Sequence, residues 1–141
     1  MLNDSNETEV SLSKEIGYLE NYIELQKLRF KDQAYIEFHL KNDQFFDGKV
    51  PPFILISFVE NAFKHGDVND PSKPITICCE VKDEVLHFMV SNKKSTHQKD
   101  DTSGIGMNNV KRRLDLIYGD KYSLKILNNE DFYSCELSLV L

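Results

Sequence analysis

Residues 51–66 have the sequence Pro-Pro-Phe-Ile-Leu-Ile-Ser-Phe-Val-Glu-Asn-Ala-Phe-Lys-His-Gly, and this stretch decides how the chain is interpreted. Proline is tolerated in the first turn of a helix and glycine commonly follows the last turn, so the stretch predicts one helix between its prolines and its final glycine. Ile56, Val59 and Phe63 fall on one face of that helix, at the spacing of residues that pack on a core.

A second face of this predicted helix is polar. Asn61, Lys64 and His65 lie on it, with Ser57 one turn earlier and Glu60 on its flank. An amide oxygen is a hard ligand for Mg²⁺, and a lysine supplies a point charge for phosphate. The face therefore fits a magnesium–phosphate ligand, and the alternative from spacing alone is an ordinary solvated helix face.

A glycine pair provides a second candidate phosphate site. Gly104, Ile105, Gly106 and Met107 lead directly into a helix predicted from Met107 to Tyr118. Glycines allow backbone amides to approach a phosphate, and a helix N-terminus favours an anion. A simple turn with a helix cap is the alternative. The other positions of interest on this helix are the core stripe Met107, Val110, Leu114 and Ile117, and the adjacent polar pair Asn109 and Arg113.

The remaining segments predict a single α+β sheet domain. Ser11 or Ser13 can cap a helix that runs to about residue 30, with Glu15 placed favourably in its first turn. Its apolar stripe is Leu12, Ile16, Leu19, Ile23 and Phe30, interrupted at Gln26. Strands are predicted over residues 34–40, 75–81, 85–91, 122–127 and 132–140. The order αβαββαββ predicts one mostly antiparallel sheet covered on one face by helices.

Composition excludes several classes of function. The 141 residues carry 17 basic and 23 acidic side chains, for a net charge of −6, which argues against nucleic acid or an anionic membrane as a partner. The most apolar window, Phe53 to Val59, is far shorter than the roughly 20 residues of a membrane span. Cys78, Cys79 and Cys135 have neither disulfide-framework nor zinc spacing, so reduced thiols are expected.

Three segments together resemble one family. Residues 51–66 resemble the asparagine box of GHKL-type ATP-binding domains, in the V-E-N-A-x-K-H-G form typical of LytS-like sensor histidine kinases. Residues 104–119 are similar to that family's second glycine box and the helix after it. Residues 11–30 are similar to the stretch that precedes the nucleotide domain. The resemblance covers about residues 8–141 and implies a two-layer α/β sandwich of the GHKL (Bergerat) type.

The resemblance also implies roles for individual residues. Asn61 matches the asparagine that ligates Mg²⁺, Lys64 and His65 match positions that face the phosphates, and residues 93–103 occupy the place of a lid over ATP. The implied nucleotide-binding set is Asn61, Lys64, His65, Asn92, Gly104, Ile105, Gly106 and Met107, with Glu60, Asn109 and Arg113 as additional candidates.

The chain departs from the family at its first glycine box. Where D-x-G-x-G is expected, the sequence has Val90-Ser91-Asn92-Lys93-Lys94, so Asn92 stands in place of the aspartate that accepts the adenine amino group. An amide oxygen can accept that hydrogen bond, although more weakly than a carboxylate. The two glycines are missing.

The second departure concerns the histidine that the family phosphorylates. His39, His65, His87 and His97 all lack its Pro-His-Phe-type context, so no catalytic residue is assigned and the phosphoacceptor is expected outside this chain. Ser57 stands where related ATPases carry a glutamate that activates water. A serine hydroxyl cannot hold a proton at neutral pH, which favours phosphoryl transfer over hydrolysis.

The resemblance thus implies a histidine kinase fragment that uses ATP and Mg²⁺. Residues 1–10 would be a lead-in, residues 11–33 a connecting helix and residues 34–141 the ATP-binding domain. The implied partners are a response regulator and the upstream dimerisation and phosphoacceptor segment, in a homodimer whose catalytic domain is cytoplasmic and whose anchor lies in the inner membrane. The alternative is a degenerate GHKL-fold interaction module without productive nucleotide binding.

Overall fold

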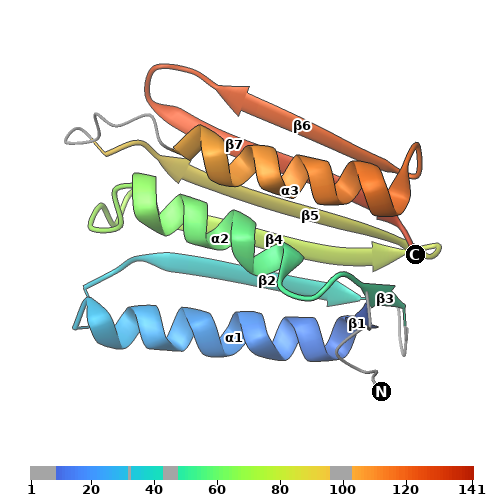
Figure 1. Cartoon of the computed structure of the whole chain (residues 1–141). Coiled ribbons are helices and arrows are strands. Elements are labelled where there is room, and N and C mark those ends of the chain that lie inside the picture. Colours follow the sequence, from blue (N-terminus) through green and yellow to red (C-terminus); the bar gives the residue numbers. More distant parts are fainter. Residues whose placement is uncertain (1–8, 32, 43–47, 96–102) are drawn as a thin grey trace.

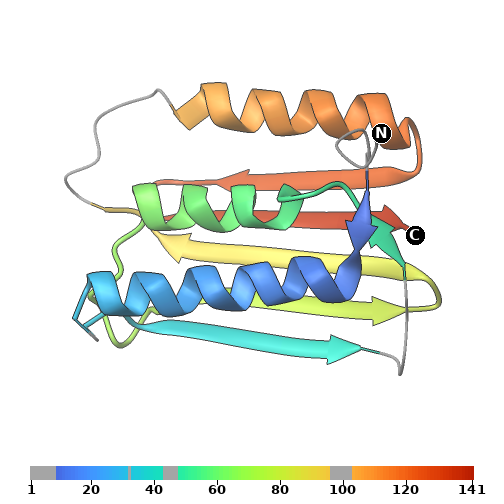
Figure 2. The ribbon, with the colours of Figure 1, turned by 60° about the horizontal axis from the view of Figure 1, so that its bottom comes forward.

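The fold has two layers, a sheet and a helical cover on one of its faces (Figures 1 and 2). The computed structural model describes residues 9–31, 33–42, 48–95 and 103–141. Within these ranges five strands form one sheet, in the spatial order β2 (Ile36–Asn42), β4 (Ile75–Lys82), β5 (Val85–Lys93), β7 (Phe132–Val140) and β6 (Tyr122–Asn128). Strands β2 and β4 are parallel and all other neighbours are antiparallel. The predicted α+β sandwich with a mostly antiparallel sheet is confirmed.

The elements follow the predicted order with two additions. The helices are α1 (Leu12–Arg29), α2 (Ile54–His65) and α3 (Ser103–Tyr118). The additions are β1 (Val10–Ser11) and β3 (Lys49–Val50), which pair with each other. Strands of two residues have no periodic pattern, so sequence alone does not predict them.

Helix α1 packs on the same core as the sheet. The Ser11 side chain caps it by accepting a hydrogen bond from the Lys14 amide at 3.2 Å. Its buried stripe contains Leu12, Ile16, Leu19 and Ile23, as predicted. Gln26 is also buried, so it continues the stripe instead of interrupting it, and Phe30 is half-buried.

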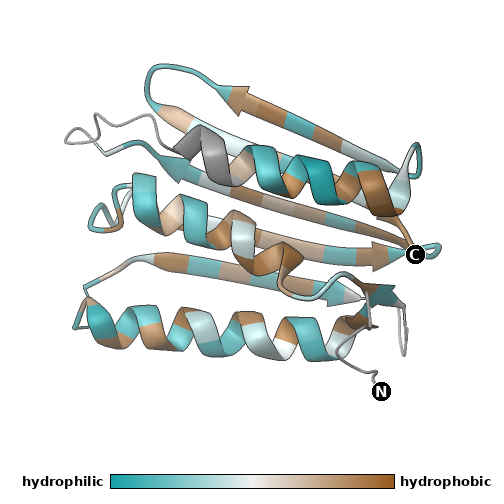
Figure 3. Ribbon diagram, in the orientation of Figure 1, coloured by the Kyte–Doolittle hydropathy of each residue, from teal (hydrophilic) through white to brown (hydrophobic). Residues whose placement is uncertain are grey.

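The start of α2 differs from the prediction. The helix begins at Ile54, after the two prolines, and its N-cap is Phe53 in the left-handed conformation, with φ of 63°. The buried face of α2 is also wider than predicted, because α2 lies over the sheet between the other two helices (Figure 1). Phe58 and Ala62 are therefore buried, whereas Ile56 is only half-buried. Apolar residues gather at the N-terminal end of α2 and polar residues at its C-terminal end (Figure 3).

Gly66 is the C-cap of α2, as predicted, and its amide donates a hydrogen bond to the Ala62 carbonyl oxygen at 2.7 Å. Its φ of −93° and ψ of 162° are extended, not left-handed. A Cβ atom at this position would lie 2.5 Å from the Ala62 carbonyl oxygen and 2.9 Å from Asn92 Nδ2. Glycine is required here because the chain passes close to the end of β5.

Helix α3 begins at Ser103, four residues before the predicted start, so the glycine pair lies inside its first turn and not in a loop. A glycine costs only about 1 kcal/mol in a helix, and the burial of Met107, Val110 and Leu114 outweighs that cost. Ile117 was expected in the core stripe but is 39% exposed. Tyr118 is half-buried instead. It lies 11 residues after Met107, which is about three helical turns, so it falls on the same face as Met107. Gly119, with φ of 58°, ends the helix as predicted.

The loop after α2 is tied to the end of β5 by an ion pair. Lys93 Nζ lies 2.9 Å from Asp70 Oδ2, and Ser72 donates two hydrogen bonds to Asp70 Oδ1. The hydrogen bonds from Ser72 and Lys93 lower the pKa of Asp70 from its ordinary value of 3.8 to about 2.

The lowered pKa predicts a specific acid dependence of stability. The contribution of Asp70 is complete above its ordinary pKa and is lost as the pH falls toward its folded-state pKa. The difference in free energy of unfolding between the wild type and Asp70→Asn, measured with urea, should therefore shrink as the pH falls from about 5 to about 2. Asp120→Asn, at an exposed turn, is the control. A difference for Asp70→Asn that stays constant over this range would contradict the prediction.

Candidate functional site

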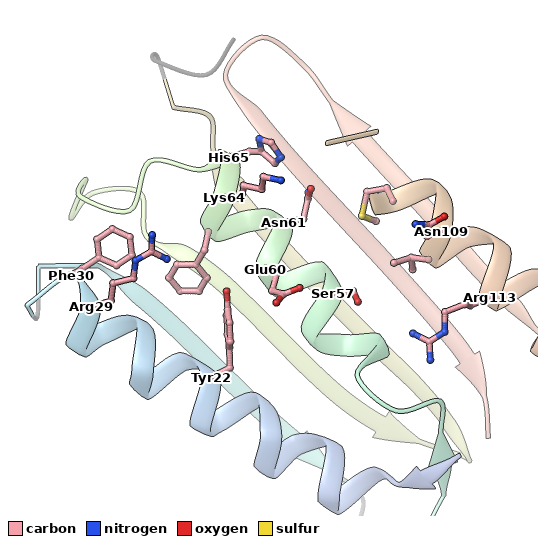
Figure 4. Close-up of a pocket in the computed structure, with 13 residues that line it drawn as sticks. Tyr22, Arg29, Phe30, Ser57, Glu60, Asn61, Lys64, His65, Asn109 and Arg113 are labelled. Carbon is pink, nitrogen blue, oxygen red and sulfur yellow. The ribbon is translucent and has the colours of Figure 1, made fainter. Parts of the chain in front are cut away.

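A cavity of about 730 Å³ opens between the three helices, on the helical side of the sheet (Figure 4). Its lining combines cationic, amide and aromatic side chains from all three helices. The lining residues are Tyr22, Arg29 and Phe30 from or next to α1, Ser57, Glu60, Asn61, Phe63, Lys64 and His65 from α2, and Met107, Asn109, Val110 and Arg113 from α3.

Helix α2 supplies the central wall. The structure brings Asn61, Lys64 and His65 together on the cavity, with Ser57 one turn earlier. His65 Nε2 is buried and has no hydrogen-bond partner among the described residues, so it can still interact with a ligand. Glu60 also lines the cavity, although it lies about 100° around the helix from Asn61. Its side chain lies on the side that faces α1 (Figure 4).

Helix α3 supplies the opposite wall. Met107 and Val110 are buried and form an apolar part of the lining, and Asn109 is exposed toward solvent. Arg113 is anchored because its Nη2 donates a hydrogen bond to the Pro52 carbonyl oxygen at 2.9 Å. These α3 residues therefore face the polar residues of α2 across one cavity.

The first turn of α3 and the predicted lid are only partly described. Gly104, Ile105 and Gly106 belong to the first turn, but their side-chain surroundings fall outside the described part of the structure. Of residues 93–103, the segment 96–102 is not described, and His97 lies within it. The roles expected for these residues remain predictions.

Asn92 does not line the cavity. It is 2% exposed, its Nδ2 donates a hydrogen bond to the Lys93 carbonyl oxygen at 3.1 Å, and its side chain lies against Gly66. It remains near the His65 end of the cavity, because Gly66 directly follows His65 in the chain. The structure thus places Asn92 beside the cavity and separates it from the other predicted site residues.

The lysines that replace the family's glycine box are both engaged elsewhere. Lys93 pairs with Asp70, as described above, and Lys94 Nζ donates to the Asn129 carbonyl oxygen at 2.6 Å. The side chains of this segment therefore tie the end of β5 to its neighbouring loops.

The α1 side of the cavity was not predicted. Phe63 makes an edge contact with Tyr22, with ring centroids 5.8 Å apart, and stacks on Phe30 at 6.4 Å. The Arg29 guanidinium lies 5.6 Å from the Phe30 ring centre. Burial, and then the nearby Glu60 carboxylate, raises the pKa of Tyr22. Tyr22 and Arg29 are two helical turns apart, which places them on one face, but only the packing of α1 beside α2 shows which cavity they line.

The chemistry of the lining fits a phosphorylated ligand with a divalent cation. Among the described lining residues, Arg29, Lys64 and Arg113 bring three cationic side chains against the single carboxylate of Glu60, in a chain whose net charge is −6. No group of three His, Cys, Asp or Glu side chains is placed to hold a metal within the described ranges. A cation bound here would take most of its ligands from an anion and water, with the Asn61 amide as a hard oxygen ligand, which suits Mg²⁺.

Two of the four histidines lie outside the candidate site. His39 and His87 are on β2 and β5, and neither lines the cavity. Among the helices described, none has both the length and the apolar character needed to cross a membrane.

Comparison with known proteins agrees with these features. The family model described as Histidine kinase matches residues 1–34. The sensor protein LytS of Oceanobacillus iheyensis is 30% identical over 142 residues, which cover 89% of this chain and 24% of that protein. The sensor histidine kinase BtsS of Escherichia coli K12 is 27% identical over 128 residues, covering 89% and 22%. The chain therefore spans about a quarter of the length of these relatives.

The fold has its own counterparts among solved structures. The catalytic domain of the histidine kinase ThkA superposes with a TM-score of 0.63 at 18% identity, covering 94% of this chain and 95% of that domain. At this identity the likeness concerns the fold alone. The chain is thus similar in sequence to LytS-like sensor histidine kinases over most of its length, and it has the two-layer GHKL-type fold of histidine kinase catalytic domains.

Proposed function

We propose that this chain binds ATP with Mg²⁺ in the cavity between its three helices and transfers the γ-phosphoryl group to a histidine outside the chain. The observation that carries the proposal is the convergence of Asn61, Lys64 and His65 from α2 with Asn109 and Arg113 from α3 on one cavity. From that histidine the phosphoryl group would pass to a response regulator. The full-length protein is proposed to be a homodimeric sensor kinase anchored in the inner membrane.

The proposed roles follow from the chemistry of each side chain. The Asn61 amide oxygen would hold Mg²⁺, which when bound neutralises charge on the phosphate oxygens. Lys64 would bind phosphate oxygens, as would His65 Nε2, which has no partner within the described part of the chain, and the amides at Gly104 and Gly106 would do so at the N-terminus of α3. Positioning and charge stabilisation account for most of the catalysis of phosphoryl transfer, so no protein nucleophile is required here.

Transfer to a histidine is favoured over hydrolysis because neither Ser57 nor Glu60 is placed to activate water as the glutamate of related ATPases is. The Ser57 hydroxyl donates a hydrogen bond to the Phe53 carbonyl oxygen at 3.0 Å. Glu60, the only carboxylate among the described lining residues, is exposed and lies toward α1.

A second candidate function is an interaction module that does not bind nucleotide. One observation favours it: Asn92, which stands for the adenine-binding aspartate, is absent from the described cavity lining. The contacts of Lys93 with Asp70 and of Lys94 with Asn129 also favour this function, because they hold both lysine side chains away from the cavity.

Calorimetric titration of the chain with ATP and ADP, with and without Mg²⁺, separates the two functions. Micromolar binding that strengthens with Mg²⁺ is expected for the kinase. No detectable binding at millimolar nucleotide, in a sample whose circular dichroism shows it folded, would favour the interaction module.

If Asn92 occupies the adenine-facing position that the resemblance implies, Asn92→Asp should tighten ATP binding several-fold, because a carboxylate accepts a hydrogen bond about twice as strongly as a neutral amide. The same change removes the donor to the Lys93 carbonyl oxygen, so a modest loss of stability should accompany it. Titration with ATP and GTP measures the effect and its selectivity. Unchanged ATP affinity, or an equal change for GTP, would count against a base-reading role for Asn92.

A further inference from the structure

Glu15 has a different role from the one its position in α1 suggests. It was expected to interact favourably with the first turn of its own helix, but its side chain is fully buried and faces α2. Its Oε1 accepts a hydrogen bond from the Phe53 amide at 2.9 Å, and its Oε2 accepts one from the Leu55 amide at 3.0 Å. Helix α2 has no side-chain cap from its own N-cap residue. Glu15 therefore caps α2 from another helix.

The beginning of α2 depends on these contacts with α1. Phe53 has φ of 63°, a left-handed conformation that is unfavourable for a bulky residue and persists only where its surroundings hold it. Besides the hydrogen bond to Glu15, the Phe53 ring stacks on Tyr18 of α1, with ring centroids 5.1 Å apart. Two residues of α1 thus hold the strained residue at which α2 begins.

Helix α3 joins the same point through Arg113. Its guanidinium donates to the carbonyl oxygen of Pro52, the residue before Phe53, and its charge acts on the Glu15 carboxylate. We call this junction of Glu15, Arg113 and residues 52–55 the Glu15 node. It is a point at which all three helices are linked by polar contacts.

The Glu15 node stands at one end of the candidate site. Arg113 belongs to both the node and the cavity lining, and Asn61 lies six residues after Leu55 on the same helix. A helix of this length moves as a rigid element, so the position of its first turn sets the position of Asn61. The cavity walls come from the same three helices that the node connects.

Burial of the Glu15 carboxyl group disfavours its charged form. Burial raises the pKa of Glu15 above its ordinary value, even though the amides of Phe53 and Leu55 and the charge of Arg113 favour ionisation. Buried groups with a perturbed pKa beside a cleft are candidates for a functional role.

We propose that Glu15 is a positioning residue that holds α1, α2 and α3 at the spacing at which Asn61 and Arg113 face the same ligand. The inference rests on the proposed nucleotide site, and it makes α1 part of that site's control: a displacement of α1 moves the first turn of α2 and, with it, the proposed metal ligand.

The test compares Glu15→Gln with the matched control Glu20→Gln, which changes an exposed glutamate of the same helix, in the whole chain. Glutamine keeps the shape of the side chain but presents a donor to one of the two amides. Amide hydrogen exchange in residues 53–61 should accelerate at least about tenfold in Glu15→Gln, since one hydrogen bond to a charged group is lost, while exchange in β5 and β7 stays unchanged.

The functional readout is the ratio of ATP affinities with and without Mg²⁺. Glu15→Gln should lower this ratio about tenfold through the displaced Asn61, and Glu20→Gln should leave it unchanged. Loss of stability alone would weaken both affinities equally. Should Glu15→Gln fail to fold, Glu15→Asp keeps the charge but is one methylene shorter, and the same two measurements apply to it.

Each outcome distinguishes the inference from the proposed function. An unchanged Mg²⁺ ratio in the variant, with normal binding by the wild type, overturns the inference alone. Exchange that accelerates equally throughout the sheet and α2 also overturns it, because the role is then merely structural. A wild type that binds no nucleotide overturns the proposed function and the functional part of the inference together.

Discussion

Replacing Asn61 with alanine is expected to abolish the Mg²⁺-dependent part of ATP binding. The side chain lies on the central wall of the cavity, and Glu60, the one carboxylate among the described lining residues, lies toward α1 and is poorly placed to replace the amide as a metal ligand. Loss of one interaction with a charged group costs about 1.5–3 kcal/mol, so ATP affinity in the presence of Mg²⁺ should fall at least about tenfold. Affinity without Mg²⁺ should change little.

Titration calorimetry on Asn61→Ala, with Asn69→Ala as the control, measures this effect. Asn69 is an exposed asparagine on the loop after α2, outside the cavity lining. Urea unfolding of both variants verifies that the fold is retained. An Asn61→Ala protein that binds ATP and Mg²⁺ as the wild type does would show that the proposed metal role is wrong.

Gly66→Ala is expected to affect stability and binding together. The added Cβ would lie 2.5 Å from the backbone oxygen of Ala62, which cannot move without distorting the last turn of α2. Overpacking of this kind costs about 1–3 kcal/mol in the free energy of unfolding. Because His65 immediately precedes Gly66 and lines the cavity, the shift should also weaken ATP binding.

Gly17→Ala provides the matched control for this substitution. Gly17 lies within α1, and a Cβ added there would meet nothing within 4 Å. Alanine at such a helical position should stabilise the protein by about 0.5–1 kcal/mol. Urea unfolding of both variants tests the pair, and equal effects of the two substitutions would contradict the close approach at Gly66.

Most secondary-structure elements could be predicted because their signals are local. The period of apolar residues marks α1 and α3, the prolines and glycine bound α2, and alternation with short polar turns marks the four strands after residue 74. The polar residues Asn61, Lys64 and His65 could be grouped for the same reason, since helical spacing alone places them on one face.

The boundaries that failed depended on contacts made elsewhere. The left-handed Phe53 delays the start of α2, and this conformation exists because Glu15 and Tyr18 of another helix hold it. Gly66 caps α2 as predicted, but its need for a small side chain comes from the Ala62 carbonyl oxygen and from Asn92 of β5, not from a left-handed conformation.

The amino-acid sequence by itself determined the order of elements, the apolar and polar faces of α2 and the likeness to a kinase family, because these depend on residue types at short, regular spacing. Tertiary structure alone decided which helices share the cavity, that Tyr22 and Arg29 of α1 line it, and that Asn92 stands beside it. It also decided that Glu15 caps α2 across a separation of 38 residues. Such contacts join residues far apart in the chain, so no local pattern encodes them.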